Sequence, residues 1–367
     1  LGSAAIRRDG LFALPDKKGK AWTVQCSAQV DAVCDVRFTV LDPNGTPVGE
    51  ATASGTSGLA RTGIAVDKPR LWNPWDSPKA MPGEQPRYTL RAEALGETPH
   101  SAEVRFGFRE VEYGQNGLFV NGERILLKGG CIHHDHGVLG SAAHDLAEIR
   151  KVRLLKEAGY NAIRTSHNPP SEALLEICDR FGLLVIDEVH DEWEVAKTPQ
   201  GYHRHFVQHA EEDARDMVRR DRNHPSVWCW SIGNEIPGCY ERPDLALKLR
   251  QAVLSEDPSR PITAGLCPPW WKDPTWKDWR TSAEPACRHL DIVGMNYLWA
   301  EVRPDHDAYP ERLVMQTETY ALEAYDCWKS VTECPWNFGD FVWTAQDYRG
   351  EAGIGQSYAA IVLRGPH

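Results

Sequence analysis

The sequence predicts two domains, an antiparallel β-sandwich followed by an (α/β)8 barrel. Its 367 residues exceed the size at which a single hydrophobic core stops growing, about 250 to 300 residues. Short alternating segments fill the first part of the chain, and apolar runs alternate with helical patterns in the rest. We therefore expect a sandwich over residues 1–108, a connection over 109–122 and a barrel over 123–367.

The expected sandwich rests on segments of alternating polarity between Trp22 and Phe108. "TVQCSAQV", "DVRFTVL" and "RYTLRAEAL" are such segments, and turn-forming clusters such as "DPNGTP" separate them. Short strands joined by tight turns are typical of a small sandwich. No part of this region suggests catalysis.

The expected barrel rests on eight strand-like runs, each followed by a polar stretch or a helical pattern. Asp145 can cap a helix that ends at Gly159, and a second helix runs from Ser171 to Gly182. An open doubly wound sheet is the rival architecture, but the first run leads into "GGCIHHDHG" and not into a G-x-G-x-x-G loop. The runs are Ile125–Lys128, Asn161–Arg164, Leu183–Asp187, Val227–Ile232, Ile262–Leu266, Ile292–Met295, Leu313–Thr317 and Phe341–Thr344.

Charge and aromatic content narrow the class of substrate. The formal charge of −11 repels nucleic acid and anionic membrane surfaces, so we expect neither as a partner. The chain carries 14 Trp and 11 Tyr, and aromatic rings beside polar groups suit sugars, although many of the Trp residues belong to the core. A neutral or weakly charged substrate is therefore expected.

The cysteines and the hydropathy pattern indicate a cytoplasmic protein. Ten cysteines are scattered along the chain without a C-x-x-C pair, as expected for reduced, buried thiols. No apolar run approaches the roughly 20 residues that span a bilayer.

Polar residues follow the strand-like runs, at the end of a barrel where reactive groups gather. Two carboxylates from different strands can cleave a glycosidic bond, because one donates a proton to the leaving oxygen and the other attacks or stabilises the anomeric carbon. Glu235 and Glu318 form the best pair, although an isolated glutamate at a strand end is as often part of an ion pair. The strand-end residues are His133, His134, Asp135 and His136; Arg164, Ser166, His167 and Asn168; Asp187, Glu188 and His190; Asn234 and Glu235; Asn296 and Tyr297; Glu318 and Tyr320; Trp343 and Asp347.

Five stretches of the sequence that contain these strand-end residues resemble sequences of glycoside hydrolase family 2. They are "RDRNHPSVWCWSIGNEIPG", "NAIRTSHNPP", "LLVIDEVHDEW", "LVMQTETY" and "FVWTAQDYRGEAGIG". The stretch from "LWNPWDSP" to "FGFRE" resembles the immunoglobulin-like sandwich of that family and its junction to the barrel. The resemblance implies a retaining hydrolase that acts by double displacement through a covalent glycosyl-enzyme, with Glu235 as general acid/base and Glu318 as nucleophile.

The resemblance also implies roles for the residues around the two glutamates. Asn234 would hold the sugar 2-hydroxyl, and Tyr297 and Arg164 would orient Glu318 and keep it ionised. His133 and His167 would contact sugar hydroxyls or the transition state, Trp343 would stack under the ring, and Asp187 is a further candidate for substrate binding.

Three questions of function stay open at this stage. The most favoured substrates are terminal β-galactosides, and a β-glucuronide or β-galacturonide is the runner-up because Arg349 could bind a carboxylate. The "HHDH" cluster with Glu188 and His190 could bind a divalent metal, but the H-E-x-x-H spacing is absent and we expect no metal and no cofactor.

The third question concerns completeness. Relative to the family, we expect the jelly-roll domain before the sandwich to be missing and the barrel to be incomplete at its eighth helix. A truncated, non-catalytic carbohydrate-binding remnant is therefore the alternative to an enzyme. Homo-oligomers are common in the family, so a homo-oligomer is a further expectation.

Overall fold

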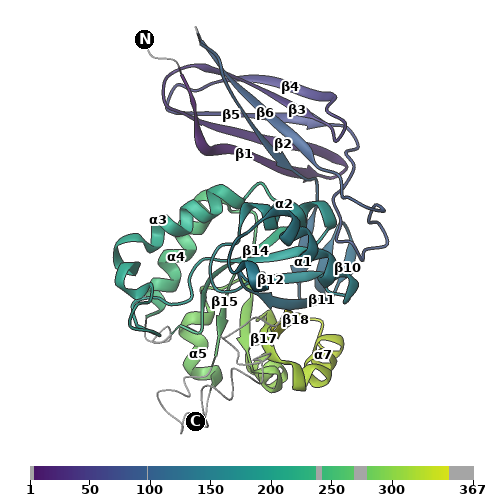
Figure 1. The fold of residues 1–367 in the computed structure, drawn as a ribbon, viewed down its shortest axis with the longest axis vertical. Coiled ribbons are helices and arrows are strands. Elements are labelled where there is room, and N and C mark those ends of the chain that lie inside the picture. The colour runs from purple at the N-terminus through teal and green to yellow at the C-terminus, as the bar shows by residue number, and fades with distance from the viewer. Residues whose placement is uncertain (1–3, 97, 237–241, 268–278, 347–367) are drawn as a thin grey trace.

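The structure is a computed structural model that describes residues 4–96, 98–236, 242–267 and 279–346. A β-sandwich lies at one end of the molecule and a closed barrel with its helices forms the rest (Figure 1). The predicted fold class, a sandwich followed by a TIM barrel, is confirmed.

The sandwich consists of two antiparallel sheets. Strands β1 (Ile6–Lys18), β2 (Ala21–Val30) and β5 (Leu59–Val66) form one sheet in the order β1-β2-β5. Strands β3 (Asp35–Leu41), β4 (Pro47–Ser54), β6 (Tyr88–Leu95) and β7 (His100–Phe106) form the other in the order β4-β3-β6-β7. Alternate residues of β2 and β6 are buried, so each sheet turns one apolar face to a shared core.

The stretch expected as a connection, residues 109–122, carries two strands, and a third strand follows it within the range expected as barrel. β8 (Val111–Gly114), β9 (Gly117–Val120) and β10 (Glu123–Ile125) form a small antiparallel sheet. Leu118 and Val120 are buried in one apolar cluster with Leu127 and Phe338 of the barrel. The small sheet therefore covers apolar side chains of the barrel.

Eight parallel strands close the barrel, because the first pairs with the last at Leu127 and Gly339. The bounds of the first and last strands differ from those of the predicted runs. The first strand extends further along the chain than predicted and includes two glycines. A Cβ on Gly129 would lie 2.3 Å from Phe341 Cδ1, so the strand requires glycine at this position. A glycine interrupts the apolar pattern from which a strand is predicted. The strands are β11 (Leu127–Ile132), β12 (Ala162–Thr165), β13 (Leu184–Glu188), β14 (Val227–Asn234), β15 (Ile262–Leu266), β16 (Val293–Asn296), β17 (Val314–Tyr320) and β18 (Asn337–Trp343).

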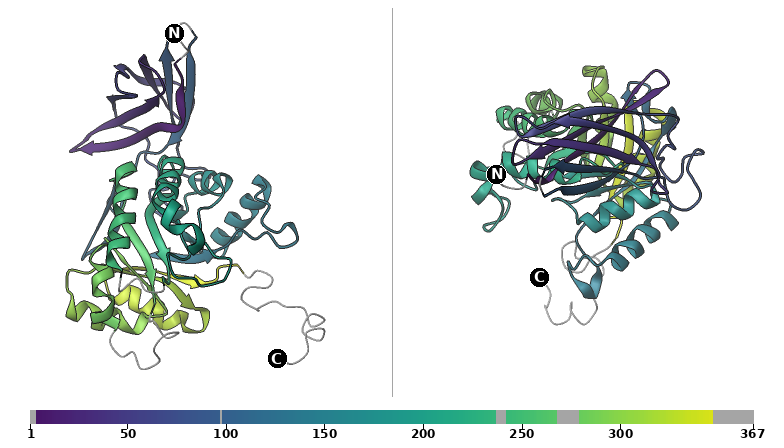
Figure 2. Two further views of the ribbon diagram at one scale, coloured as in Figure 1. Left: turned by 90° about the vertical axis from the view of Figure 1, so that its left-hand side faces the viewer. Right: turned by 90° about the horizontal axis from the view of Figure 1, so that it is seen from above.

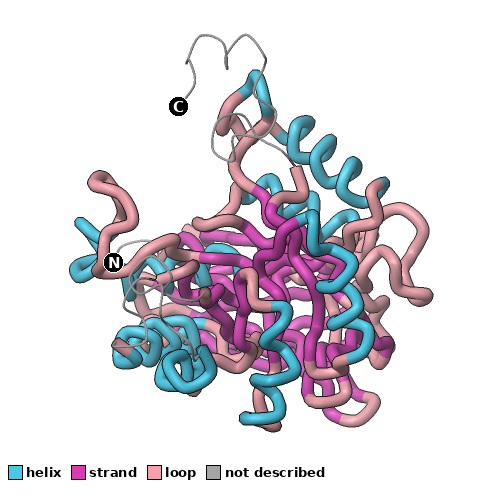
Figure 3. The backbone as a smooth tube through the Cα atoms, turned by 90° about the horizontal axis from the view of Figure 1, so that it is seen from below, coloured by secondary structure: helices cyan, strands magenta, loops and turns pink. Residues whose placement is uncertain are grey.

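Helices surround the strands, as views from the side and from below show (Figures 2 and 3). Ser171 caps the second helix by accepting the amide of Leu174 at 3.1 Å, and Gly182 ends it with a φ of 74°. Residues 347–367, where the barrel is expected to be incomplete at its eighth helix, lie outside the described residues. The helices are α1 (Asp145–Glu157), α2 (Glu172–Phe181), α3 (His203–Asp221), α4 (Pro243–Glu256), α5 (Trp279–Cys287), α6 (Val302–Ala308) and α7 (Ala324–Glu333), with short 3-10 turns η1 (Gly137–Leu139), η2 (Trp299–Glu301) and η3 (Ala321–Glu323).

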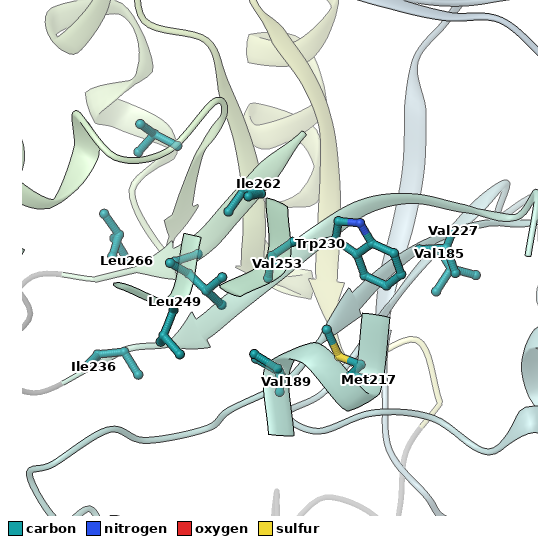
Figure 4. Packing of buried hydrophobic residues seen from close by; sticks show 14 of the residues in the cluster. Val185, Val189, Met217, Val227, Trp230, Ile236, Leu249, Val253, Ile262 and Leu266 are labelled. Carbon is teal, nitrogen blue, oxygen red and sulfur yellow. The ribbon is translucent and has the colours of Figure 1, made fainter. Parts of the chain in front are cut away.

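The main core lies between the strands and this helical layer. Trp230 of β14 packs among apolar side chains from neighbouring strands and from α3 and α4 (Figure 4). Its indole N–H donates to Asp257 Oδ2 at 3.0 Å, so the buried ring has no unpaired polar atom. Among the described helices, none is long and apolar enough to cross a membrane.

The sandwich contacts the barrel at the carboxyl ends of α2 and α3. Asn223 Oδ1 accepts a hydrogen bond from the backbone amide of Ala13 at 2.9 Å, and Asn223 Nδ2 donates one to the carbonyl oxygen of Leu11 at 3.0 Å. Trp72 donates to the carbonyl of Asp179 at 2.8 Å. Because these helix ends lead into the amino ends of the next strands, the sandwich leaves the opposite, carboxyl-end mouth uncovered by these contacts.

Candidate active site

The carboxyl ends of the barrel strands bring most of the predicted site residues into one hydrogen-bonded cluster. Glu318 belongs to β17 and is 3% exposed, whereas Glu235 follows β14 and is partly buried. Arg164 of β12 is fully buried and donates to Glu318 of β17 and to Asn234 of β14, the residue before Glu235. Because the strands are parallel and closed, groups far apart in the sequence meet at this mouth.

Glu318 receives a donor at each carboxylate oxygen. Arg164 Nη1 donates to Oε1 at 2.8 Å, and the Tyr297 hydroxyl donates to Oε2 at 2.9 Å. His167 Nε2 lies 3.6 Å from Oε1. Burial and the charge of Glu318 raise the pKa of Tyr297, so its hydroxyl stays protonated and remains a donor. A cation and a fixed hydroxyl thus hold Glu318 in one orientation.

Glu235 has a different environment from Glu318. Burial and the charge of Glu318 raise the pKa of Glu235, although Asn296 and Lys197 oppose this. Asn296 Nδ2 donates to Oε1 at 3.1 Å, and the backbone amide of Glu235 donates to Gly265 O at 2.7 Å. The residue adopts a φ of 43°, in the left-handed region. A carboxyl group with a raised pKa can act as a proton donor near neutral pH.

Asn234 precedes Glu235 in the chain and shares the donor Arg164 with Glu318, and its amide orientation follows from its partners. Arg164 Nη2 and Asn296 Nδ2 donate to Oδ1 at 2.8 Å and 3.0 Å. Nδ2 therefore faces His167 Nε2 at 3.1 Å and Asp191 Oδ1 at 3.2 Å. The amide group presents a donor on the side of His167.

Three rings form one wall of the cluster. Trp343 stacks on His167 with ring centroids 5.2 Å apart and an interplanar angle of 5°. His133 meets Trp343 edge-on at 4.9 Å. Burial and the neighbouring His167 lower the pKa of His133 to about 4, so His133 is neutral at physiological pH. Apolar faces beside polar edges suit a sugar ring.

The sequence interpretation missed the role of Glu188, which it treated only as a candidate metal ligand. Arg164 donates to Glu188 Oε2 from Nε and Nη2 at 3.0 Å and 2.7 Å, and Ser231 donates to the same oxygen at 2.6 Å. Oε1 lies 2.7 Å from His167 Nδ1. Burial alone would raise the pKa of Glu188, but Arg164 and His167 lower it to about 2. Glu188 therefore positions two residues of the cluster.

Three other histidines proposed for a metal contact groups outside this cluster. His190 Nε2 lies 3.2 Å from Ala210 O, and its ring stacks on Tyr202 at 4.7 Å. His134 Nε2 lies 3.1 Å from Pro169 O, and His136 Nε2 lies 3.3 Å from Glu148. These histidines contact the helical layer and the loops beside it.

Asp187 requires a correction, because the structure does not place it in the cluster. It is fully buried beside Asp221 at the end of α3, and burial together with Asp221 raises its pKa well above the ordinary value. Adjacent strand residues point to opposite faces, so Glu188 faces the barrel interior and Asp187 faces the helices. The sequence placed both at one strand end without resolving which of them faces the site.

Lys197 also reaches the cluster, from the loop after β13, and no sequence pattern indicated it. Its Nζ donates to Asp191 Oδ1 at 2.7 Å and to the carbonyl of Asn234 at 2.8 Å. It therefore fixes the peptide that joins Asn234 to Glu235. Two further candidates, Asp347 and Arg349, lie outside the described residues.

Comparison with known proteins gives two family matches and a set of relatives. Residues 111–267 match the model described as "Glycosyl hydrolases family 2, TIM barrel domain", and residues 9–109 match "Glycosyl hydrolases family 2". A β-galactosidase of Bacteroides ovatus, BoGH2A, is 32% identical over 330 residues, which are 77% of this chain and 36% of that protein. A putative β-glucuronidase of Formosa agariphila is 27% identical over 86% of this chain and 34% of that protein.

A solved structure resembles the fold over nearly the whole chain. The glycosyl hydrolase family 2 member from Bacteroides cellulosilyticus DSM 14838 has a TM-score of 0.84 and 35% identity, and the match covers 96% of this chain and 48% of that one. The chain spans about a third of the length of the two curated relatives named above.

Proposed function

The chain belongs to glycosyl hydrolases family 2, and from this premise we propose that it is a retaining β-glycosidase in which Glu235 is the general acid/base and Glu318 the nucleophile. The observation that carries the proposal is the contrast between the two carboxyl groups. Burial beside Glu318 raises the pKa of Glu235, whereas Arg164 and Tyr297 donate to Glu318. One group is suited to hold a proton and the other to carry negative charge.

The reaction follows from these two states. Glu318 attacks the anomeric carbon while Glu235 donates its proton to the departing oxygen. The leaving group departs as an alcohol, and the sugar stays bound as a glycosyl ester of Glu318. Glu235, now ionised, takes a proton from water, and the resulting hydroxide attacks the anomeric carbon and releases the sugar and the Glu318 carboxylate. Two inversions give net retention of the β-configuration.

The remaining residues of the cluster have roles that fit their contacts. Asn234 is fixed by donors at Oδ1, and we assign it to the sugar 2-hydroxyl, where a contact that strengthens in the transition state lowers the barrier. We assign Trp343 to stacking on the sugar face, and His133 and His167 to its hydroxyls.

The proposed substrates are terminal β-galactosides. The similarity to a named β-galactosidase and the sequence "DFVWTAQDYRGEAGIG", which begins in β18, both favour them. A β-glucuronide or β-galacturonide is the second candidate, because other relatives are named β-glucuronidases and an arginine of that sequence, Arg349, could bind a carboxylate.

The experiment that tests the proposal is a side-by-side assay of aryl β-galactoside, β-glucuronide and β-mannoside, with the anomer of the first product followed by NMR. Hydrolysis of one substrate with initial β-product supports a retaining enzyme and selects the sugar. An initial α-product contradicts the double displacement. Silence on all three from a folded sample favours the carbohydrate-binding remnant, and calorimetry with the free sugars then tests that reading.

A further inference from the structure

Tyr320 lies beside the proposed nucleophile, yet the reaction described above does not use it. It is the last residue of β17, two residues after Glu318, and is paired in register with Trp343 at the end of β18. Tyr297 contacts both residues, since its hydroxyl donates to Glu318 and its ring stacks on Tyr320 with centroids 4.3 Å apart. Thr319 between them donates in another direction, to Asp340 at 2.7 Å. Tyr320 therefore lies on the Glu318 side of the strand, one step nearer the mouth.

The ring of Tyr320 is partly covered and partly free. Tyr297 stacks on it at an interplanar angle of 29°, yet 53% of Tyr320 remains exposed. Leu322 and Tyr325, the next large apolar residues, are 97% and 79% exposed. An exposed aromatic surface beside a polar site is typical of a binding surface for a ligand with apolar faces.

We propose that the exposed part of the Tyr320 ring is a stacking surface for the leaving group, either an aryl ring or the next sugar of an oligosaccharide. The inference rests on the proposed function. The sugar that is cleaved off is terminal, so only the leaving group continues outward toward the solvent, and Tyr320 at the end of β17 lies nearer that mouth than Glu318. Both kinds of leaving group present an apolar face to a ring, which is the chemistry they share.

The test compares substrates that carry the same sugar and differ in the leaving group: the glycosyl fluoride, the phenyl β-glycoside and a disaccharide. Tyr320→Ala should lower kcat/KM for the phenyl and disaccharide substrates by about two- to tenfold, the range of one aromatic contact, and leave the fluoride unchanged. Tyr320→Phe keeps the aromatic ring and should retain kcat/KM for the phenyl and disaccharide substrates. Tyr113→Ala is the matched control, since Tyr113 is a tyrosine 40% exposed on β8.

Two outcomes overturn the proposal. Equal losses on all three substrates would show that Tyr320 only supports Tyr297, and no loss on any of them would show that the leaving group does not contact the ring. A loss on the phenyl glycoside alone identifies aryl leaving groups as the ligand, and a loss on the disaccharide identifies a sugar.

The failure of the proposed function is recognised separately. If the folded wild-type chain hydrolyses none of the three substrates, this result contradicts the proposed enzymatic function and leaves the proposed stacking surface to be tested by binding. Titration calorimetry with phenyl β-galactoside then decides, because Tyr320→Ala should weaken binding by the same factor. An unchanged dissociation constant would refute the stacking surface.

Discussion

Glu188→Gln tests the network beneath the proposed nucleophile, because the exchange removes a charge while almost preserving the side-chain shape. Glu188 is fully buried and accepts from Arg164 and Ser231 at one oxygen. Its pKa falls from the ordinary value of 4.5 to about 2. This shift corresponds to about 3 kcal/mol of stability, and breaking one side of a buried ion pair typically costs about 3 to 5 kcal/mol. We expect a loss of unfolding free energy of about 3 kcal/mol at pH 7.

The sign of the pH dependence follows from the direction of that shift. A carboxyl group whose pKa is lower in the folded state stabilises the protein above its unfolded pKa, and this contribution is lost as the pH falls through the folded pKa. The difference in unfolding free energy between wild type and Glu188→Gln should therefore be largest at pH 6 to 7 and decrease as the pH falls from about 4.5 to about 2.

Urea denaturation followed by tryptophan fluorescence at several pH values measures both effects. Glu176→Gln is the control, because Glu176 pairs with Arg87 and Arg105 at a side chain 33% exposed, where an ion pair contributes about 1 kcal/mol or less. Equal losses for the two variants, or a Glu188→Gln deficit that does not change with pH, would refute the assignment of Glu188 as a buried, ionised partner of Arg164.

Three further predictions concern the two proposed catalytic groups and their surroundings. Glu318→Gln should abolish turnover of an aryl β-glycoside, whereas Glu235→Ala should lose less rate on activated leaving groups and regain rate with added azide; no azide effect would refute the division of roles. Lys197→Met removes a cation that opposes the raised pKa of Glu235, so the basic limb of the kcat profile should move to higher pH; an unmoved limb would exclude this coupling. Asp187→Asn should raise the melting temperature at pH 8 and change it little at pH 4. The folded pKa of Asp187 is raised by burial and Asp221, so its contribution to stability is lost as the pH rises; an equal change at both pH values would contradict this.

The architecture and the identity of the proposed catalytic pair were accessible from the sequence, because both depend on local patterns. Apolar runs of strand length alternate with capped helices, and Ser171 caps a helix in the structure as the sequence predicts. Parallel strands in a closed barrel place their carboxyl ends at one mouth, so polar residues after the runs are expected to converge there. The ends of β11 and β18 were less accessible, since Gly129 lacks the apolar signal that marks a strand.

The tertiary structure alone decided which strand-end residues meet and what each environment does to their charges. Whether Asp187 or Glu188 faces the interior depends on the pleat of β13, and a one-residue difference reverses the side on which a side chain lies. The pKa of Glu235 depends on its burial and its distance from Glu318, 83 positions later in the sequence numbering, and Lys197 reaches the same peptide from a loop. Sequence patterns report local preference, whereas electrostatic energies depend on distances in space between residues far apart in the chain.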